Sequence, residues 1–138
     1  NVTMKLCGKP CTVYADRQLM EELLYNLCDN AIRYNNRGGS VTVTVDEKDG
    51  HVFLSIRDTG IGIPTEHQDR VFERFYRVDK SRSKATGGTG LGLAIVKHIV
   101  AQHGASISLE SQAGKGTEIR VEFSDALKQQ MEERAENA

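Results

Sequence analysis

Residues 22–35 have the sequence ELLYNLCDNAIRYN, and this stretch decides what the chain around it can form. Its apolar side chains recur at three- and four-residue spacing, and Met20 extends the pattern toward the N-terminus: Met20, Leu23, Leu24, Leu27 and Ala31. That spacing predicts an amphipathic helix over about residues 19–34 with one core-facing stripe. Asp16 stands where the N-cap of such a helix belongs.

Three polar side chains in the same stretch follow one another at i, i+4 and i+7: Asn26, Asn30 and Arg33. At about 100° per residue they flank the apolar stripe. Asn is a poor helix former, which leaves two interpretations open. The three form a solvated helix edge, or an amide oxygen binds a hard cation such as Mg²⁺ while the arginine holds phosphate.

Outward from this helix, periodicity predicts further elements. They are a hairpin-like pair of strands in 2–14, strands at 41–45 and 52–56, a short helix at 65–75 entered through Pro64, a loop at 78–90, a helix at 91–103, and strands at 107–109 and 119–123. Tight turns between neighbouring strands favour antiparallel pairing. Helices on one face of a mixed sheet give a two-layer α+β domain over 1–124, with a polar tail at 125–138.

Composition narrows the possible functions. The chain has 138 residues and a net charge of −1, which argues against a protein that coats nucleic acid. Its three cysteines lack zinc spacing, so we expect reduced, non-catalytic thiols in a cytoplasmic setting. Eight of the 13 glycines fall in three clusters: 60 and 62; 87, 88, 90 and 92; 114 and 116. Clustered glycine indicates tight turns or close approach to a ligand.

Two of these glycine clusters lie beside groups that could bind a ligand. Asp58 follows the strand predicted at 52–56 and precedes paired glycines, so it can accept a hydrogen bond from an exocyclic amine. Residues 87–93, GGTGLGL, enter a helix whose first N–H groups can bind phosphate. Two known phosphate-binding motifs are excluded. A dinucleotide-binding fingerprint would need a glycine at position 93, where this chain has Leu93. A P-loop would need Ser or Thr directly after the Gly114–Lys115 pair, which is followed by Gly116.

Taken in order, five motifs carry a resemblance: ELLYNLCDNAIRYN (22–35), DTGIGIP (58–64), VFERFYRVD (71–79), GGTGLGL (87–93) and GKGT (114–117). They resemble the N, G1, F and G2 boxes and the last glycine turn of the ATP-binding catalytic domain of bacterial sensor histidine kinases. This domain is part of a wider superfamily of gyrase, heat-shock and mismatch-repair ATPases. The F and G2 boxes look most like the phosphate-regulon type. The resemblance covers about residues 13–124 and implies a Bergerat fold, a two-layer sandwich with a largely antiparallel sheet.

The resemblance implies ATP and Mg²⁺ as cofactors. Asn30 would bind the metal, Asn26 would support metal and phosphates, and Arg33 and Arg77 would assist at the phosphates. Asp58 would accept the adenine amino group, with Thr117 assisting and Gly60 and Gly62 letting the base lie close. The implied nucleotide-binding set also includes Tyr34, Ile63, Tyr76, Gly88, Thr89, Gly90, Leu91, Gly92 and Leu93.

Superfamily members that hydrolyse ATP place a glutamate four residues before the metal-binding Asn, where this chain has Asn26. An amide is no general base, which favours phosphoryl transfer to a histidine. None of the four histidines has the sequence context of an acceptor: His51, His67, His98 and His103. The resemblance therefore implies a separate dimerisation and phosphoacceptor domain before residue 1 and relay to a response regulator. From the net charge of −1 we expect no nucleic-acid partner.

We also expect a monomeric fragment of a homodimeric protein, and a cytoplasmic domain of a membrane-anchored sensor. Two other functions stay open. One is a regulatory nucleotide-binding module without transfer activity, and the other is a self-sufficient ATPase.

Overall fold

The computed structural model describes residues 2–13, 15–76 and 92–123. Its elements, in chain order, are β1 (Thr3–Gly8), α1 (Arg17–Arg33), β2 (Ser40–Lys48), β3 (His51–Asp58), α2 (Thr65–Gln68), α4 (Gly92–Gln102), β4 (Ser106–Gln112) and β5 (Gly116–Phe123). The polar tail predicted at 125–138 and the loop predicted at 78–90 lie outside the described residues.

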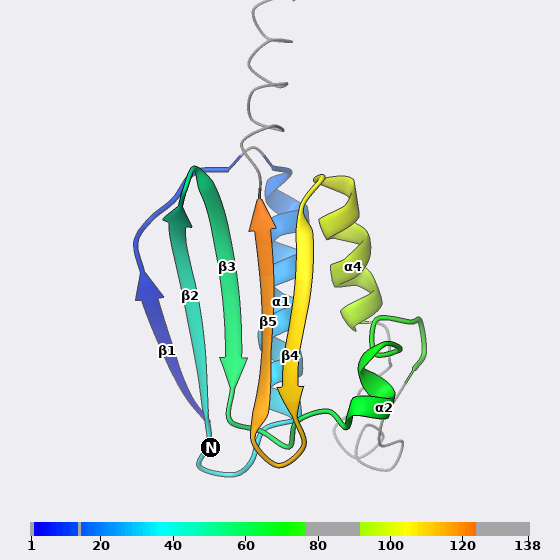
Figure 1. Ribbon diagram of the computed structural model, residues 1–138. Helices are drawn as coiled ribbons and strands as arrows, with labels where there is room; N and C mark the ends of the chain where they lie inside the picture. The colour runs from blue at the N-terminus through cyan, green and yellow to red at the C-terminus, as the bar shows by residue number, and fades with distance from the viewer. Residues whose placement is uncertain (1, 14, 77–91, 124–138) are drawn as a thin grey trace, which may run out of the picture.

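The strands form one five-stranded sheet in the order β1-β2-β3-β5-β4 (Figure 1). The three pairs β2–β3, β3–β5 and β5–β4 are antiparallel, whereas β1 pairs with β2 in parallel. Asp49 and Gly50 both have positive φ at the β2–β3 turn, as tight hairpins require. The sheet is therefore mixed and largely antiparallel, as the sequence predicts.

The predicted hairpin at residues 2–14 is wrong. β1 is a single strand, and its parallel partner β2 comes after the whole of α1. Beyond Gly8 the Lys9 N–H still donates to the Val45 carbonyl at 2.9 Å, and then the chain leaves the sheet. Pro10 has no N–H to continue the ladder, and Val13 packs against the core from outside the strands.

The helix predicted at 65–75 is also shorter than expected, because α2 ends at Gln68. From there the backbone makes three-residue turns, with N–H donors of Arg70, Glu73 and Tyr76 reaching the carbonyls three positions earlier. Phe75 then has a φ of 65°, a left-handed conformation that no α-helix continues through. Val71 and Phe72 thus pack in or against the core although they are not part of a helix.

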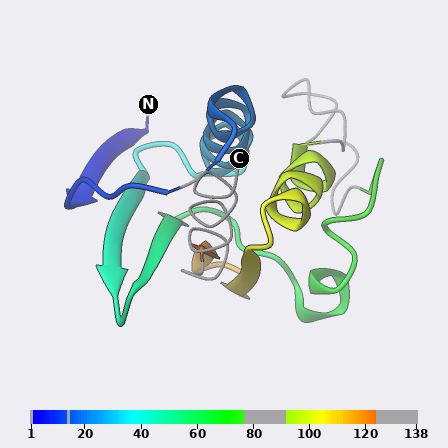
Figure 2. The same ribbon diagram turned by 90° about the horizontal axis from the view of Figure 1, so that it is seen from above.

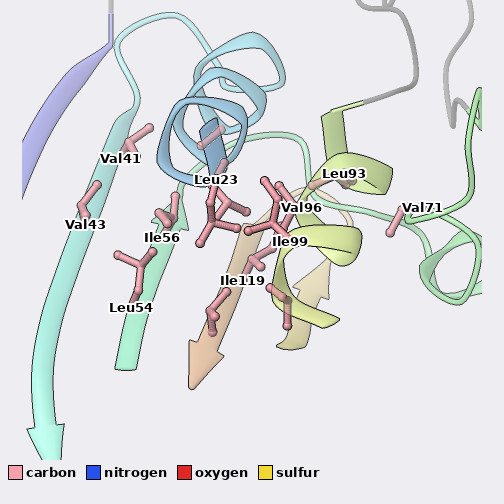
Figure 3. Close-up of a cluster of buried hydrophobic side chains, with 14 of the residues drawn as sticks. Leu23, Val41, Val43, Leu54, Ile56, Val71, Leu93, Val96, Ile99 and Ile119 are labelled. Atoms are coloured by element: carbon pink, nitrogen blue, oxygen red, sulfur yellow. The ribbon is translucent and has the colours of Figure 1, made fainter. Parts of the chain in front are cut away.

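α1 and α4 lie side by side on one face of the sheet, which gives two layers (Figure 2). The core between them is formed by side chains from both helices and three central strands (Figure 3): Leu23, Leu27, Ala31, Leu93, Val96, Ile99, Val100, Val41, Val43, Leu54, Ile56, Ile119 and Val121. Leu24, expected in the apolar stripe, is 38% exposed because it lies beside the buried Leu23–Leu27–Ala31 row. No helix within the described residues is long and apolar enough to cross a membrane.

The start of α1 is fixed at two points. Asp16 is its N-cap, as predicted, and its carboxylate accepts from the Leu19 N–H at 3.0 Å. The buried His103, just after α4, accepts from the Asp16 N–H at its Nε2 over 3.1 Å, and its Nδ1 donates to the Ile99 carbonyl at 2.8 Å. The imidazole is therefore neutral, and it connects the two helices.

We expect His103→Ala to lower the free energy of unfolding by about 2 kcal/mol, because it leaves the Asp16 N–H and the Ile99 carbonyl without this partner. Urea denaturation measures the change. His98→Ala is the matched control, since His98 is exposed on α4 and should change stability by less than about 0.5 kcal/mol. Equal effects of the two substitutions would contradict the role of His103.

Candidate nucleotide-binding site

The sequence motifs meet at one end of the sheet. β3 ends there at Asp58, β5 begins there at Gly116, α1 ends there and α4 begins there (Figure 1). This arrangement brings the first, second and fifth motifs together with the start of α4. Residues as far apart in the sequence as Asn26 and Thr117 thus share one region.

Asp58 is the buried carboxylate of this region, only 9% exposed. Its Oδ1 accepts from the Gly60 N–H at 2.9 Å and from the Thr117 N–H at 3.2 Å. Within the described part of the chain no hydrogen bond reaches Oδ2, so this oxygen is available to a ligand. Burial raises the pKa of Asp58, and the two backbone hydrogen bonds offset this only in part.

The two glycines after Asp58 are required by the protein's own backbone. A Cβ on Gly60 would lie 2.3 Å from the Tyr34 carbonyl oxygen, and a Cβ on Gly62 would lie 2.0 Å from that of Gln112. Gly62 also has a φ of 71°, which disfavours any side chain. Close packing therefore explains both glycines, and their predicted role beneath a nucleobase stays a prediction.

Asn26 faces the beginning of α4. Its Nδ2 donates to the Glu22 carbonyl at 2.8 Å, and a Cβ placed on Gly92 would lie 3.4 Å from its Oδ1. The amide oxygen is thus close to the N-terminal end of a helix, where phosphate binding is favoured. Asn30 lies one turn further along α1 and is half-buried, and its side-chain amide has no hydrogen bond within the described residues.

The last turn of α1 is tied to other groups. Arg33 Nε donates to Asp29 Oδ2 at 2.7 Å, and this hydrogen bond raises the pKa of Arg33. The predicted phosphate contact would therefore share the guanidinium with Asp29. Tyr34 is the C-cap, and its carbonyl accepts from the Ile61 N–H at 3.0 Å, which fixes the segment after Asp58 against the helix end.

Tyr76 lies at the border of the described residues and is held by two neighbours. His67 Nδ1 and the Tyr76 hydroxyl form a hydrogen bond, and the Arg70 guanidinium lies 4.6 Å from the centre of the tyrosine ring. The ring is half-buried and packs against the core. Its predicted contact with nucleotide stays a prediction.

Five predicted site residues lie outside the described residues: Arg77, Gly88, Thr89, Gly90 and Leu91. Of their neighbours, Gly92 begins α4 and Leu93 is buried in the core, so Leu93 has a packing role whatever else it does. Ile63 is half-buried, and its N–H donates to Ser111 Oγ at 2.7 Å.

Sequence reasoning missed two residues that shape the site. Ser111 lies beside Thr117 and has three hydrogen-bond partners, and its place just before the GKGT motif was the available signal. Asn35 is buried, and its Nδ2 donates to the Ser40 carbonyl at 2.9 Å. The helix motif ends at Asn35, and the sequence gave no indication that Asn35 is buried and the following Asn36 exposed.

The oxygen atoms that the side chains offer here are suitable ligands for a nucleotide-bound Mg²⁺ ion. Asparagine amide oxygens are hard ligands of the kind that Mg²⁺ accepts, and Mg²⁺ takes few protein ligands when phosphates supply the others. Among the described residues no group of three or more His, Cys, Asp or Glu forms a metal cage. The predicted roles of Asn30 at the ion and of Asp58 at the base are consistent with these ligands and stay predictions.

The fold and these side chains define a two-layer α+β domain with a nucleotide-type site at one end of its sheet. The family model for histidine kinase-, DNA gyrase B- and HSP90-like ATPases matches residues 15–127, and the chain belongs to this family. Its architecture is the Bergerat ATPase fold expected from the sequence, and its solved neighbours are histidine kinase catalytic domains.

Two curated relatives are sensor kinases. Sensor histidine kinase YkoH of Bacillus subtilis (strain 168) is 46% identical over 113 residues, which cover 82% of this chain and 24% of that protein. Sensor protein SrrB of Staphylococcus aureus (strain MRSA252) is 46% identical over 123 residues, which cover 89% of this chain and 21% of that protein. The chain thus spans about a quarter or less of these relatives.

Two solved structures are similar over 88% of this chain. The mycobacterial sensor histidine kinase MprB is 33% identical with a TM-score of 0.77, and 80% of that chain is covered. Full-length ShkA, solved in complex with AMPPNP, is 31% identical with a TM-score of 0.73, and 25% of that chain is covered. The phosphate-regulon subtype stays a prediction.

Proposed function

We propose that this chain binds Mg·ATP and acts as the catalytic domain of a sensor histidine kinase, donating the γ-phosphoryl group to a histidine on a separate domain. The observation that carries the proposal is Asp58, whose Oδ1 is used by the fold while Oδ2 is left to accept a hydrogen bond from an adenine amino group. The sensor-kinase names of its relatives support it.

The phosphate end of the site would be formed by α1 and the start of α4. Asn30 and Asn26 would hold the metal and phosphates, with Arg33 adding positive charge beside them. When bound, Mg²⁺ neutralises charge on the phosphates, which is the main electrostatic need of phosphoryl transfer. The chain's own residues position the nucleotide and leave the nucleophile to another domain.

Asn26 separates transfer from hydrolysis. An amide cannot take a proton from water. The chain therefore has no general base at the position where ATP-hydrolysing members of the wider superfamily place a glutamate. A histidine acceptor does not need one, since a neutral imidazole is already nucleophilic near pH 7. We therefore favour transfer over ATP hydrolysis, and the five motifs in order favour it over regulatory nucleotide binding.

The partners follow from the same proposal. The acceptor histidine would belong to a dimerisation and phosphoacceptor domain that this chain does not include, and the phosphoryl group would pass on to a response regulator. The relatives are four to five times longer than the aligned region, which leaves room for such domains. We propose a cytoplasmic domain of a homodimeric, membrane-anchored sensor.

The test has two arms. The chain is mixed with the separately produced acceptor domain of its full-length protein, and with Mg²⁺ and γ-labelled ATP. We expect acid-labile label on the acceptor histidine. Binding of ATP without transfer of label would favour the regulatory-module function instead.

In the second arm the chain is incubated alone with Mg²⁺ and ATP. We expect negligible release of phosphate, because Asn26 offers no base to activate water. Steady hydrolysis over many turnovers would contradict the transfer proposal and favour a self-sufficient ATPase. Heat-denatured chain gives the background rate.

A further inference from the structure

Ser111 completes a row of three polar side chains across the sheet. It lies on β4 opposite Thr117 on β5, which lies opposite Asp58 on β3. Register partners in antiparallel strands project to the same face. The row therefore places Ser111 directly behind Thr117, one strand further from Asp58.

The hydroxyl of Ser111 has three partners. Its Oγ accepts from the Ile63 N–H at 2.7 Å, lies 3.0 Å from the Gly116 carbonyl oxygen and lies 2.7 Å from Thr117 Oγ1. A hydroxyl has one hydrogen and two acceptor positions. All three contacts are hydrogen bonds only when the Ser111 hydrogen points to the Gly116 carbonyl, because that oxygen can only accept. The second acceptor position of Ser111 then takes the hydroxyl hydrogen of Thr117.

This assignment fixes the polarity of Thr117. Its hydrogen is committed to Ser111, so Thr117 Oγ1 can only accept hydrogen bonds from a ligand. Asp58 Oδ2 is an acceptor as well when the carboxyl is ionised. Two acceptors suit an exocyclic amino group, which has two hydrogens, and disfavour an exocyclic carbonyl oxygen, which has none.

The backbone of Ser111 is also held in place. Gln68 Nε2 donates to the Ser111 carbonyl at 3.0 Å and to the Ile63 carbonyl at 2.9 Å. This amide joins the end of β4 to the segment that follows Asp58. Ser111 therefore presents its hydroxyl to Ile63 and Thr117 from a position fixed on both sides.

We propose that Ser111 is a positioning residue that sets nucleobase specificity. By holding the Thr117 hydroxyl as an acceptor, it makes the site select a 6-amino purine over a 6-oxo purine without touching the base itself. The inference rests on the proposed function, since it assumes that a purine nucleotide lies against Asp58 and Thr117.

The experiment compares the affinities of the chain for ATP and ITP, both with Mg²⁺. We expect the parent to bind ATP at least about 100-fold more tightly than ITP. Ser111→Ala should lower this ratio about tenfold, because the Thr117 hydrogen becomes free to turn toward a carbonyl oxygen. Ser108→Ala, at an exposed position of the same strand, should leave the ratio unchanged.

A merely structural role would weaken both nucleotides equally, so an unchanged ATP/ITP ratio in Ser111→Ala overturns the inference. Thr117→Val provides a second variant, since it removes the hydroxyl whose polarity is at issue. We expect it to lower the ratio, and adding Ser111→Ala to it should lower the ratio no further. A further independent loss in the double variant also overturns the inference.

Failure of the proposed function has a different signature. If the parent binds neither nucleotide, both the proposed function and the inference fall. If the parent prefers ATP and Ser111→Ala keeps that preference in full, only the inference falls. Thermal unfolding of each variant shows whether the fold is intact.

Discussion

Asp58→Asn is expected to weaken ATP binding by about 100-fold or more while leaving the domain folded. An asparagine can keep its Oδ1 in the position that accepts from the Gly60 and Thr117 N–H groups. Its Nδ2 then replaces Oδ2 and presents a donor to the adenine amino group, which is also a donor. The site loses a charge-assisted hydrogen bond and gains a mismatch, and both effects act against adenine.

The same substitution should stabilise the nucleotide-free domain near pH 7. Because burial raises the folded-state pKa of Asp58, the stability it contributes is fully present below the unfolded-state pKa of about 3.9. That stability is lost as the pH rises through the folded-state pKa. The variant has no carboxyl to ionise, so its advantage over the parent should be larger at pH 7 than at pH 4.

Titration calorimetry with Mg·ATP and urea denaturation at the two pH values measure both effects. Asp46→Asn is a matched control, because Asp46 is on the exposed side of β2 and far from the site end of the sheet. It should change neither ATP affinity nor the pH dependence of stability. An Asp58→Asn variant that binds ATP like the parent would contradict the adenine assignment.

The helix motif shows what periodicity can predict. The Leu23–Leu27–Ala31 stripe, the N-cap at Asp16 and the later β-hairpins all follow from local spacing, because their partners are close in sequence. The prediction for β1 was wrong because its partner strand, β2, comes beside it only after α1 has brought the chain back to the same end of the sheet. A parallel pairing across a helix leaves no local signal at residues 2–14.

The sequence motifs predicted which residues lie near one another, and the roles of these residues stay predictions. Asp58, Asn26 and Thr117 are at the same end of the sheet, as the motifs indicate. Close packing gives Gly60 and Gly62 a structural reason that the sequence did not show, because the atoms nearest to them belong to distant backbone, and their role beneath a nucleobase stays a prediction. Ser111 was missed for a related reason: its importance lies in three hydrogen bonds that form only after β4, β5 and the 61–64 segment come together.

Asn30→Ala is expected to weaken ATP binding by about 100-fold when Mg²⁺ is present and to have little effect when EDTA removes it. The amide of Asn30 has no hydrogen bond within the described residues, so the nucleotide-free fold does not depend on it. Loss of groups that only support a metal ligand already costs about 10–100-fold in metal affinity, and loss of the ligand itself should cost at least as much.

Stability should separate a metal role from a structural one in Asn30→Ala. Alanine is a better helix former than asparagine, so the free energy of unfolding without nucleotide should stay equal or rise by up to about 0.5 kcal/mol. Gln18→Ala is the matched control, since it removes an exposed amide from the same helix and should not change the Mg²⁺ dependence. Equal loss of ATP affinity with and without Mg²⁺ would show that Asn30 contacts the nucleotide directly and that the metal is held elsewhere.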